Sequence, residues 1–372
     1  MSLILDGSNG ITFPNSSTQA VGFYGFKNRI INGAMVIDQR NAGASVTIAV
    51  SQTYSVDRWK GFSAPTSKYS LQQNAGAVTP PAGFKNYVGA TSLSAYSVGA
   101  AEYEALSQII EGYNVADLGW GTANAQSVTL SFWVRSSLTG TFGGSLLNAA
   151  SVNRSYPFTY TINSANTWEY KTITIAGDQS GTWVTDNTGS IALNFGLGVG
   201  SNFSGTAGAW NGNFNFSATG ATSVVGTNGA TFYITGVQLE AGSTATSFDY
   251  RPYGTELNLC QRYFQYLAGS TATGDQYIAS GMCNTSVQAR FPYVLPVQMR
   301  VGPAVTFPSA SNFVAYSGAA TPTVTALTTA GTSDPRFFAI VATVASGLTA
   351  GYGAILLGEN TTSSAIQLSA EL

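Results

Sequence analysis

Apolar and polar residues alternate along most of the chain, as they do in strands that bury one face. The clearest run is Ser127–Arg135, whose even-numbered residues from Val128 to Val134 are apolar and share one face. Runs with the same pattern occur at 169–175, 190–195 and 231–237. Clusters of Gly, Asn and Ser separate these runs, and strands at such spacing predict an antiparallel jelly-roll sandwich over residues 26–256.

The segment Glu102–Glu111 fits two kinds of secondary structure. Leu106, Ile109 and Ile110 match the apolar stripe of a helix, which Gly112 would end. The surrounding sequence has the period of strands, so we expect a strand here as well.

A second β-sandwich is predicted for residues 257–372, after a boundary near Arg251–Gly254. Gly, Ser, Thr and Ala loops separate its apolar runs, which are short enough for a sandwich with loops crowded at its two ends. The candidate strands are 276–283, 287–294, 304–307, 313–316, 322–327, 336–344, 353–357 and 365–372.

Residues 1–25 form a predicted N-terminal arm with two short strand-like runs, Leu3–Leu5 and Ile11–Phe13. Asp6-Gly7 and Asn9-Gly10 are turn signals, and a polar break follows at 14–18. So short an arm cannot bury its apolar side chains alone. It needs a partner, either the same arm of sister chains or another protein.

Composition limits what the surface can do. Only 9% of the residues are charged, against about 25% in typical proteins, and the net charge is -2. A chain without a basic patch lacks the electrostatic term of nucleic-acid binding, so no nucleic acid is expected as a partner. No run reaches the roughly 18 apolar residues of a membrane span, and no signal peptide is evident. We expect a protein that is made in a cytoplasm, does not insert into membranes, and leaves by another route such as virion assembly and lysis.

The chain contains no histidine, which removes the commonest general base and the commonest transition-metal ligand. Cys260 and Cys283 could pair only with each other, and two buried thiols are the expected arrangement. No cofactor is expected. A structural calcium site built from Asp, Asn and backbone oxygens stays open, although no Asp-x-Asp-x-Asp-Gly loop is present.

Carboxylates offer the one enzymatic alternative, because glycoside hydrolysis needs only a pair of them. Glu102, Glu104, Glu111 and Asp117 cluster in the sequence, and the first two would lie about 7 Å apart on one strand face. Ordinary solvated carboxylates on a strand are the favoured explanation of them. A glycan-cleaving β-helix would also be longer and show repeating rungs, and no fixed-period repeat occurs. We therefore expect a protein that is not an enzyme.

Aromatic residues flanked by glycine in polar loops are the remaining signal for binding. They are Tyr113, Trp120, Trp210 and Tyr352. Sugar rings pack their C–H faces on aromatic rings, while Asn, Ser and backbone groups bond the hydroxyls. These four residues are the predicted glycan contacts. The alternative is that each one closes the end of a sandwich or fills an interface between protomers.

A series of short motifs, each different, is spread along most of the chain. They are 10–14 with 17–19, 28–35 with 38–40, 55–59, 130–136, 236–242 with 245–248 and 251–252, and finally 256–257, 260–264 and 366–372. Together they resemble a family of bacteriophage tail-fibre and tail-tip proteins. Leu130–Ser136 resembles the central strand of a carbohydrate-binding-module-like jelly roll in that family.

The resemblance implies a homotrimeric tail fibre of the virion, fixed to a tail or baseplate protein through its N-terminal arm. It also implies non-enzymatic adhesion to a host-surface polysaccharide through the jelly-roll domains. The matched segments are framework strands, so they place no sugar contact. Two alternatives stay open, a purely structural virion protein that serves as a decoration or connector, and a glycan-degrading tailspike.

Overall fold

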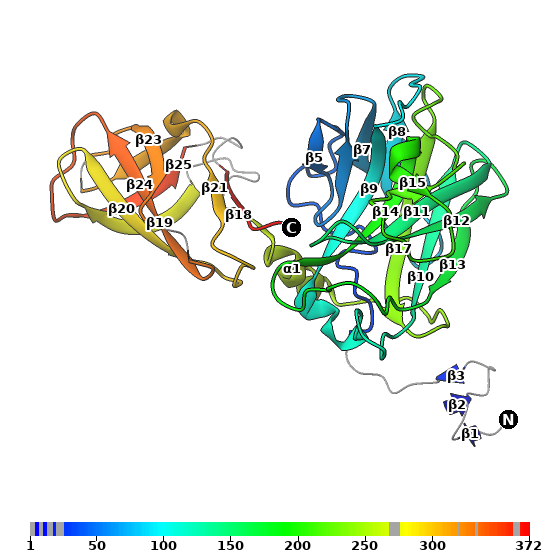
Figure 1. Cartoon of the computed structure of the whole chain (residues 1–372). Helices are drawn as coiled ribbons and strands as arrows, with labels where there is room; N and C mark the ends of the chain where they lie inside the picture. The colour runs from blue at the N-terminus through cyan, green and yellow to red at the C-terminus, as the bar shows by residue number, and fades with distance from the viewer. Residues whose placement is uncertain are drawn as a thin grey trace.

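The computed structural model describes residues 26–267, 276–318, 320–331, 334–359 and 365–372, together with three short strands before residue 26. The predicted all-β fold class is confirmed, since the described elements are strands, short 3-10 turns and one α-helix. Figure 1 shows two β modules side by side, with the helix α1 (Tyr253–Gln261) between them.

The arm contains a small antiparallel sheet of β1 (Ile4–Asp6), β2 (Gly10–Thr12) and β3 (Thr18–Gln19). The first two strands confirm the predicted strand-like runs, although Leu3 lacks a description and Phe13 lies outside the described residues. The third strand was not predicted, because two polar residues carry no period.

The first module is a sandwich of two six-stranded antiparallel sheets. The first sheet runs, in spatial order, through β13 (Glu169–Ile175), β10 (Val128–Ser136), β17 (Thr231–Ala241), β8 (Val88–Ser92), β7 (Tyr69–Gln73) and β4 (Val46–Thr47). The second runs through β12 (Ser155–Ile162), β11 (Gly140–Asn148), β14 (Gly189–Val199), β9 (Tyr103–Glu111), β6 (Lys60–Ser63) and β5 (Ser51–Tyr54).

The core of this sandwich is aromatic. Phe132 of β10 and Phe195 of β14 are fully buried and pack edge to face, with ring centres 5.0 Å apart. The alternating runs predicted these strands correctly. The ambiguous segment 102–111 is also a strand, β9, because its apolar residues pair with β14 across the centre of the sheet.

The distal module pairs a three-stranded sheet with a six-stranded one. The smaller sheet, in spatial order, is β18 (Phe264–Leu267), β26 (Ile366–Ser369) and β21 (Ala304–Thr306). The larger is β22 (Phe313–Tyr316), β25 (Gly353–Gly358), β19 (Gln276–Cys283), β20 (Gln288–Val294), β24 (Phe337–Val344) and β23 (Val324–Thr329). All eight strands expected from the sequence are present within a few residues of their predicted bounds, and β18 was missed.

The predicted boundary between residues 256 and 257 lies inside α1, a helix that the sequence did not predict. Gly254 and Asn258 are poor helix formers, and the segment is short. Neither its helix propensity nor its pattern of apolar residues therefore predicts a helix. Burial of Glu256 and Cys260 against the first module holds the helix in place.

Two of the sequence motifs meet beside this helix. The Asn28 side chain donates to the Val237 carbonyl at 3.0 Å and accepts the Leu239 amide at 3.0 Å, which ties the start of the module to its last long strand. Arg251 donates to the carbonyl oxygens of Asn28 and Ile30. The motifs are therefore framework, as the sequence analysis expected.

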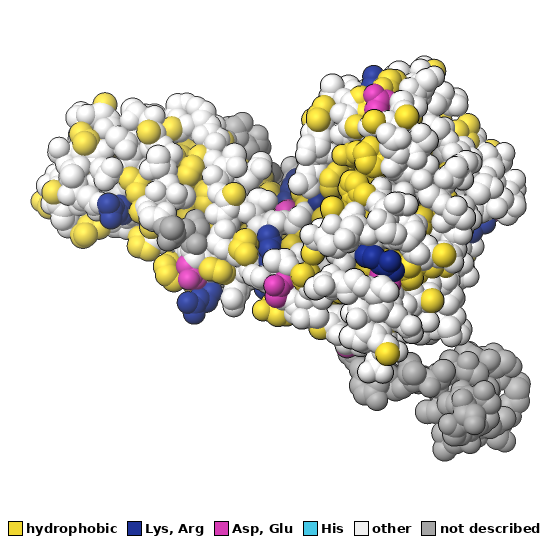
Figure 2. All heavy atoms as spheres, viewed as in Figure 1, with side chains coloured by type: hydrophobic (Ala, Val, Ile, Leu, Met, Phe, Trp, Pro, Cys, Tyr) yellow, Lys and Arg dark blue, Asp and Glu magenta, His cyan; other side chains and the backbone are white. Residues whose placement is uncertain are grey.

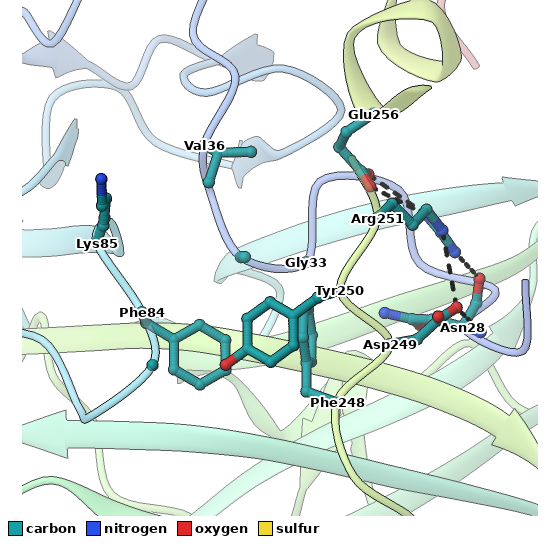
Figure 3. Close-up of a pocket in the computed structure, with 12 residues that line it drawn as sticks. Asn28, Gly33, Val36, Phe84, Lys85, Phe248, Asp249, Tyr250, Arg251 and Glu256 are labelled. Carbon is teal, nitrogen blue, oxygen red and sulfur yellow. Dashed lines mark hydrogen bonds and ion pairs between the residues drawn. The ribbon is translucent and has the colours of Figure 1, made fainter. Parts of the chain in front are cut away.

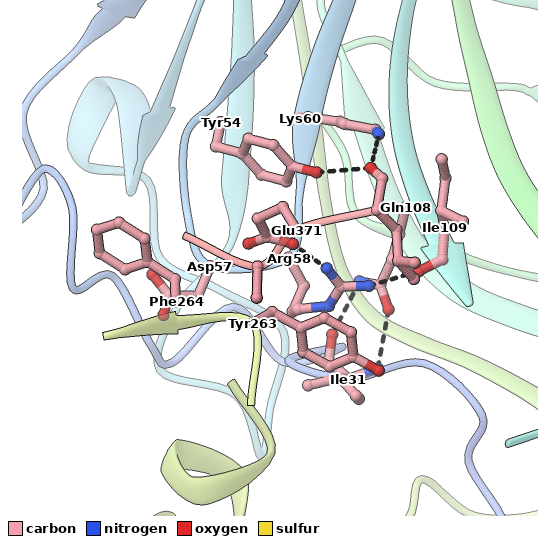
Figure 4. Close-up of polar contacts among 12 residues, drawn as sticks. Ile31, Tyr54, Asp57, Arg58, Lys60, Gln108, Ile109, Tyr263, Phe264 and Glu371 are labelled. Atoms are coloured by element: carbon pink, nitrogen blue, oxygen red, sulfur yellow. Dashed lines mark hydrogen bonds and ion pairs between the residues drawn. The ribbon is translucent and has the colours of Figure 1, made fainter. Parts of the chain in front are cut away.

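A buried polar junction joins the two modules (Figure 4). Arg58 of the first module is 2% exposed and forms an ion pair with Glu371 of the distal module. The Arg58 guanidinium also lies 3.6 Å from the centre of the Tyr263 ring and donates to the Ile109 carbonyl at 2.5 Å. The contacts with Glu371 and Tyr263 join the two modules, and the bond to Ile109 holds the Arg58 side chain within the first module.

Further ionic contacts complete the junction. Arg262 forms a two-pronged pair with Glu111 at 2.5 and 2.9 Å, and Tyr263 donates to the same carboxylate at 2.5 Å. Arg300 donates to the Asn187 and Glu371 carbonyls at 2.9 and 2.8 Å. Such forked contacts fix geometry as well as adding energy.

Burial shifts the pKa values of groups in this junction. It lowers the pKa of Lys60 to about 7, with help from the neighbouring Arg58, even though Glu371 opposes the shift. Burial also raises the pKa of Asp57 to about 6, against the influence of Arg40 and Gln39. These shifts reflect loss of water around a module interface.

The two cysteines are free and buried, which is the arrangement expected from the sequence. Cys260 packs beside Tyr263 at the junction, and Cys283 belongs to the distal core. Burial raises the pKa of the Cys260 thiol well above its usual value, so it is a packing residue and a poor nucleophile.

Candidate functional site

Two loops meet at one end of the first module, and they build the candidate site. One joins β9 to β10, and the other joins β13 to β14. The Gly112 amide donates to the Thr188 carbonyl at 2.9 Å, and the Tyr113 amide donates to the Asp186 carbonyl at 2.9 Å. Gly121 has a φ of +84° and sits where a Cβ atom would lie 2.6 Å from the Gly181 carbonyl oxygen. Glycine is therefore required at this crossing of the loops.

Three tryptophans pack edge to face where these loops meet. Trp120 lies 4.8 Å from Trp183 and 5.3 Å from Trp210, measured between ring centres. Each indole N–H donates to a backbone carbonyl, at 2.7 to 3.2 Å. The structure thus brings together two of the predicted residues, Trp120 and Trp210. The third, Trp183, was missed, although it too follows a Gly-rich loop in the sequence.

A pocket of about 270 Å³ lies beside two of these tryptophans. The residues that line it carry no charge: Val115, Ala116, Gly119, Trp120, Thr122, Trp183, Val184, Thr185, Ser190 and Ile191. The Ser190 hydroxyl is buried and has no hydrogen-bond partner among the described residues. A mostly apolar pocket with an unpaired hydroxyl in its wall suits a small, uncharged ligand that brings its own hydroxyl groups.

The other two predicted residues lie elsewhere. Tyr113 is 62% exposed and stands in the same loop as the pocket without lining it. Tyr352 is 59% exposed and belongs to the distal module, before β25. The four predicted residues therefore do not converge on one place. Trp120 is 7% exposed and helps to close the end of the sandwich, which was the alternative expected for it.

The acidic residues do not assemble a catalytic pair among the described residues. Glu104 is fully buried on the core face of β9, where burial raises its pKa to about 8 while Ser63 and Lys68 oppose the rise. Glu102 precedes the strand and accepts the Tyr96 hydroxyl and the Gly99 amide, both at 2.7 Å, and these bonds lower its pKa. No substrate can reach Glu104 while it is buried in this way.

The remaining two carboxylates are held by arginines. Glu111 is 1% exposed and pairs with Arg262 in the module junction. Asp117 pairs with Arg29 at 2.5 Å near the surface. Along strand β9, Glu111 lies about 23 Å from Glu104 at the usual strand rise, and Glu102 lies farther still.

A second pocket, of about 230 Å³, lies near the start of the module (Figure 3). Phe84, Phe248 and Tyr250 form its aromatic side, with ring centres 4.9 to 5.5 Å apart. In its wall Arg251 pairs with both Asp249 and Glu256, and Lys85 also lines the pocket. These contacts belong to the framework that ties residues near Asn28 to β17, so this pocket is the weaker candidate.

A further aromatic cluster, missed by the sequence analysis, covers part of the outer face of the sheet that contains β9. Tyr103 stacks on Phe216 with ring centres 4.3 Å apart, and Phe62 packs on the same ring at 5.8 Å. Figure 2 shows hydrophobic side chains gathered over β9 in this view. The loop that supplies Phe216 follows β14, and it could not be placed on this face without tertiary information.

Among the described residues, no group of three or more His, Cys, Asp or Glu side chains is arranged to hold a metal ion. In the same part of the chain, none of the helices has the length and apolar character that crossing a membrane requires.

Searches against family models and against curated proteins gave no match. Solved structures with similarity include the enzymatically active domain of tailspike protein 4 from bacteriophage CBA120, at 13% identity and a TM-score of 0.31, covering 58% of this chain and 21% of that one. A family 11 carbohydrate-binding module from Clostridium thermocellum, in complex with a β-1,3-1,4-mixed-linked tetrasaccharide, is 12% identical with a TM-score of 0.28, covering 56% of this chain and 100% of that one.

A putative sugar-binding protein from Bacteroides thetaiotaomicron is 11% identical with a TM-score of 0.33, covering 58% of this chain and 100% of that one. The chain thus spans about a fifth of the length of the tailspike it matches. Similarity at these scores does not indicate a function for this chain.

Proposed function

We propose that this chain is a non-enzymatic, glycan-binding subunit of a bacteriophage tail fibre. In this proposal it assembles as a homotrimer in the virion, binds a tail or baseplate protein through residues 1–25, and adheres to host-surface polysaccharide. The observation that carries the binding role is the uncharged pocket beside Trp120 and Trp183, with the unpaired Ser190 hydroxyl in its wall.

Three features support this assignment over an enzyme. The chain has no histidine, and the buried Glu104 and ion-paired Glu111 are unavailable to a substrate. The lining of the pocket lacks any carboxylate. It therefore offers hydrogen bonds and aromatic rings to a ligand, but no general acid or base for catalysis. A surface with so few charges favours recognition by shape, which several weak sites in one assembly strengthen.

Filling the mouth of the pocket is expected to weaken glycan binding. Ala116 is exposed and lines the pocket, so Ala116→Phe adds a ring there without disturbing the core. We expect binding to an array of bacterial surface polysaccharides to weaken at least about tenfold, since even a partial steric block exceeds 1.4 kcal/mol. Ala101→Phe is the matched control, because Ala101 is also exposed but lies at the far end of β9. Equal binding by both variants would contradict the pocket as the site.

Removing the unpaired hydroxyl separates binding from stability. Ser190→Ala deletes a group that makes no hydrogen bond with the described residues, so the melting temperature should be unchanged or slightly higher. If a sugar hydroxyl pairs with Ser190, affinity should fall roughly fivefold, the value of one neutral hydrogen bond of about 1 kcal/mol. Unchanged affinity for every glycan that the wild type binds would contradict a contact between Ser190 and the sugar. Absence of glycan binding by the wild type itself would favour the purely structural alternative.

The attachment role of the arm has a separate test. A chain lacking residues 1–25 should keep the melting transitions of its two modules and its glycan binding, because the described contacts of both modules lie after residue 25. It should no longer join tails in an assembly assay. Loss of the folded modules in this variant would contradict the domain division.

A further inference from the structure

The six-stranded sheet of the distal module exposes a largely apolar face. The apolar residues at its outward strand positions are Tyr277, Met282, Pro292, Val294, Tyr316, Phe337, Ala339, Ile355 and Leu357, together with Val314 and Val341, which are themselves buried; Ser280, Gln288, Arg290 and Thr343 occupy other outward positions. We call this surface the distal face. In a sheet with one solvated side, these positions are usually polar.

Strand register places these residues next to one another. Val294 pairs directly with Phe337, and Met282 pairs with Arg290. Across the sheet, Tyr277 lies opposite Leu357, and Tyr316 lies opposite Ile355. The apolar side chains therefore form one continuous surface over β22, β25, β19, β20 and β24, and are not scattered singly.

The most protruding members of the face are well exposed. Val294 is 78% exposed, Tyr277 62% and Phe337 52%. An aromatic side chain carries roughly 150–250 Å² of surface, so the half-exposed Tyr277, Tyr316 and Phe337 alone present roughly 300 Å². Val294, Met282 and their neighbours raise this to roughly 450 Å². A standard interface buries about 800 Å² on each partner, of which a little over half is apolar, so the face is large enough for one.

The charge of the distal face limits which kind of partner can bind there. Arg290 is the one ionic side chain at the outward positions of the described strands, and no carboxylate accompanies it. An acidic or basic partner would find almost nothing to pair with. Further copies of this chain bring faces that are equally apolar, so the faces of the three chains of a homotrimer can be buried together about its three-fold axis.

The position of the face leaves it free for such a partner. In Figure 1 the smaller sheet of β18, β26 and β21 is on the side of the distal module nearest the first module, and the larger sheet lies beyond it. The contacts that join the modules come from residues such as Tyr263 and Arg300, outside the larger sheet. Self-association through the distal face would therefore leave the module junction intact.

We infer that the distal face is the surface through which copies of this chain associate. This inference deepens the assembly stated in the proposed function. It makes no use of glycan binding, so its failure and the failure of the binding site are distinguishable.

Charge introduced on the face tests the inference. The full-length double variant Val294→Asp/Phe337→Asp places two carboxylates at a directly paired, exposed position, where folding does not require the original side chains. Sedimentation velocity over a concentration series should show wild-type oligomers and a dissociation constant at least about tenfold weaker for the variant. Val50→Asp, at a 57% exposed valine of the first module, is the matched control and should associate like the wild type.

A second variant without added charge distinguishes lost association from misfolding. Tyr277→Ser/Tyr316→Ser removes two rings from the same face without adding charge, and it should weaken association in the same direction while circular dichroism stays native. The inference is overturned if the wild type is a monomer throughout the series, or if both face variants associate as tightly as the wild type. It is also overturned if these variants lose polysaccharide binding and the wild type is monomeric, since the face would then be a glycan surface.

Discussion

Replacement of Arg58 with methionine is expected to lower the free energy of unfolding by about 3 to 5 kcal/mol, the usual cost of removing one partner of a buried ion pair. Burial alone would lower the pKa of Arg58, but the adjacent Glu371 outweighs it and raises the pKa, so the guanidinium stays charged. Methionine fills a similar volume and leaves Glu371 with Arg40 as its remaining arginine partner. Denaturant unfolding followed by tryptophan fluorescence measures the loss.

Two further variants identify the source of this loss. Arg336→Met removes an arginine whose pair with Asp334 is 68% exposed on the arginine side, so it should cost less than about 1 kcal/mol. Adding Glu371→Gln to Arg58→Met should lower the stability further by a smaller amount, because the ion pair of Glu371 with Arg40 is then lost as well. Equal unfolding midpoints for Arg58→Met and the wild type would show that the junction does not hold the modules together.

Glu104→Gln is expected to stabilise the protein at alkaline pH by about 2 kcal/mol, a value that allows for partial screening of the carboxylate. Burial holds the pKa of Glu104 near 8, against a usual value of 4.5. Between these two pH values the folded chain keeps a proton that the unfolded chain has lost. Wild-type stability should therefore fall as pH rises from 4.5 to 8, and the glutamine variant should lack this component.

The measurement is a series of denaturant titrations from pH 4.5 to pH 9 on both proteins. Near pH 4.5 the two should have similar stability, since both side chains are then neutral. Glu102→Gln is the matched control two residues away. Hydrogen bonds from Tyr96 and Gly99 lower the pKa of Glu102, so its replacement should destabilise slightly, with the opposite sign. Parallel pH profiles for wild type and Glu104→Gln would show that Glu104 is ionised in the folded state across this range.

The candidate site was only partly accessible from the sequence. Glycine-flanked tryptophans marked Trp120 and Trp210, and the structure packs them with Trp183. Nothing local distinguishes these from Tyr352, which belongs to the other module. The pocket itself depends on the meeting of two loops about 70 residues apart, between Ala116 and Ser190. Spacing along the chain carries no information about such a meeting.

The acidic residues also show that sequence spacing alone does not place a side chain in the fold. Glu102 and Glu104 have the spacing of a catalytic pair in an extended strand. The direction of each side chain depends on which face of β9 meets the core, and the buried face receives Glu104. A carboxylate on the apolar face contradicts the local pattern, so periodicity alone could not assign it.

What the sequence determined by itself is the all-β architecture, the longest alternating strands of the first module, most strands of the distal module and the scarcity of charge, because alternation with period two and composition are local properties. Tertiary structure decided the helix α1, the junction in which Arg58 meets Glu371, the pocket and the distal face. Each of these depends on which distant segments lie together and which side of a strand remains uncovered. That outcome follows from burying the most apolar surface over the whole chain, and no short window of residues contains it.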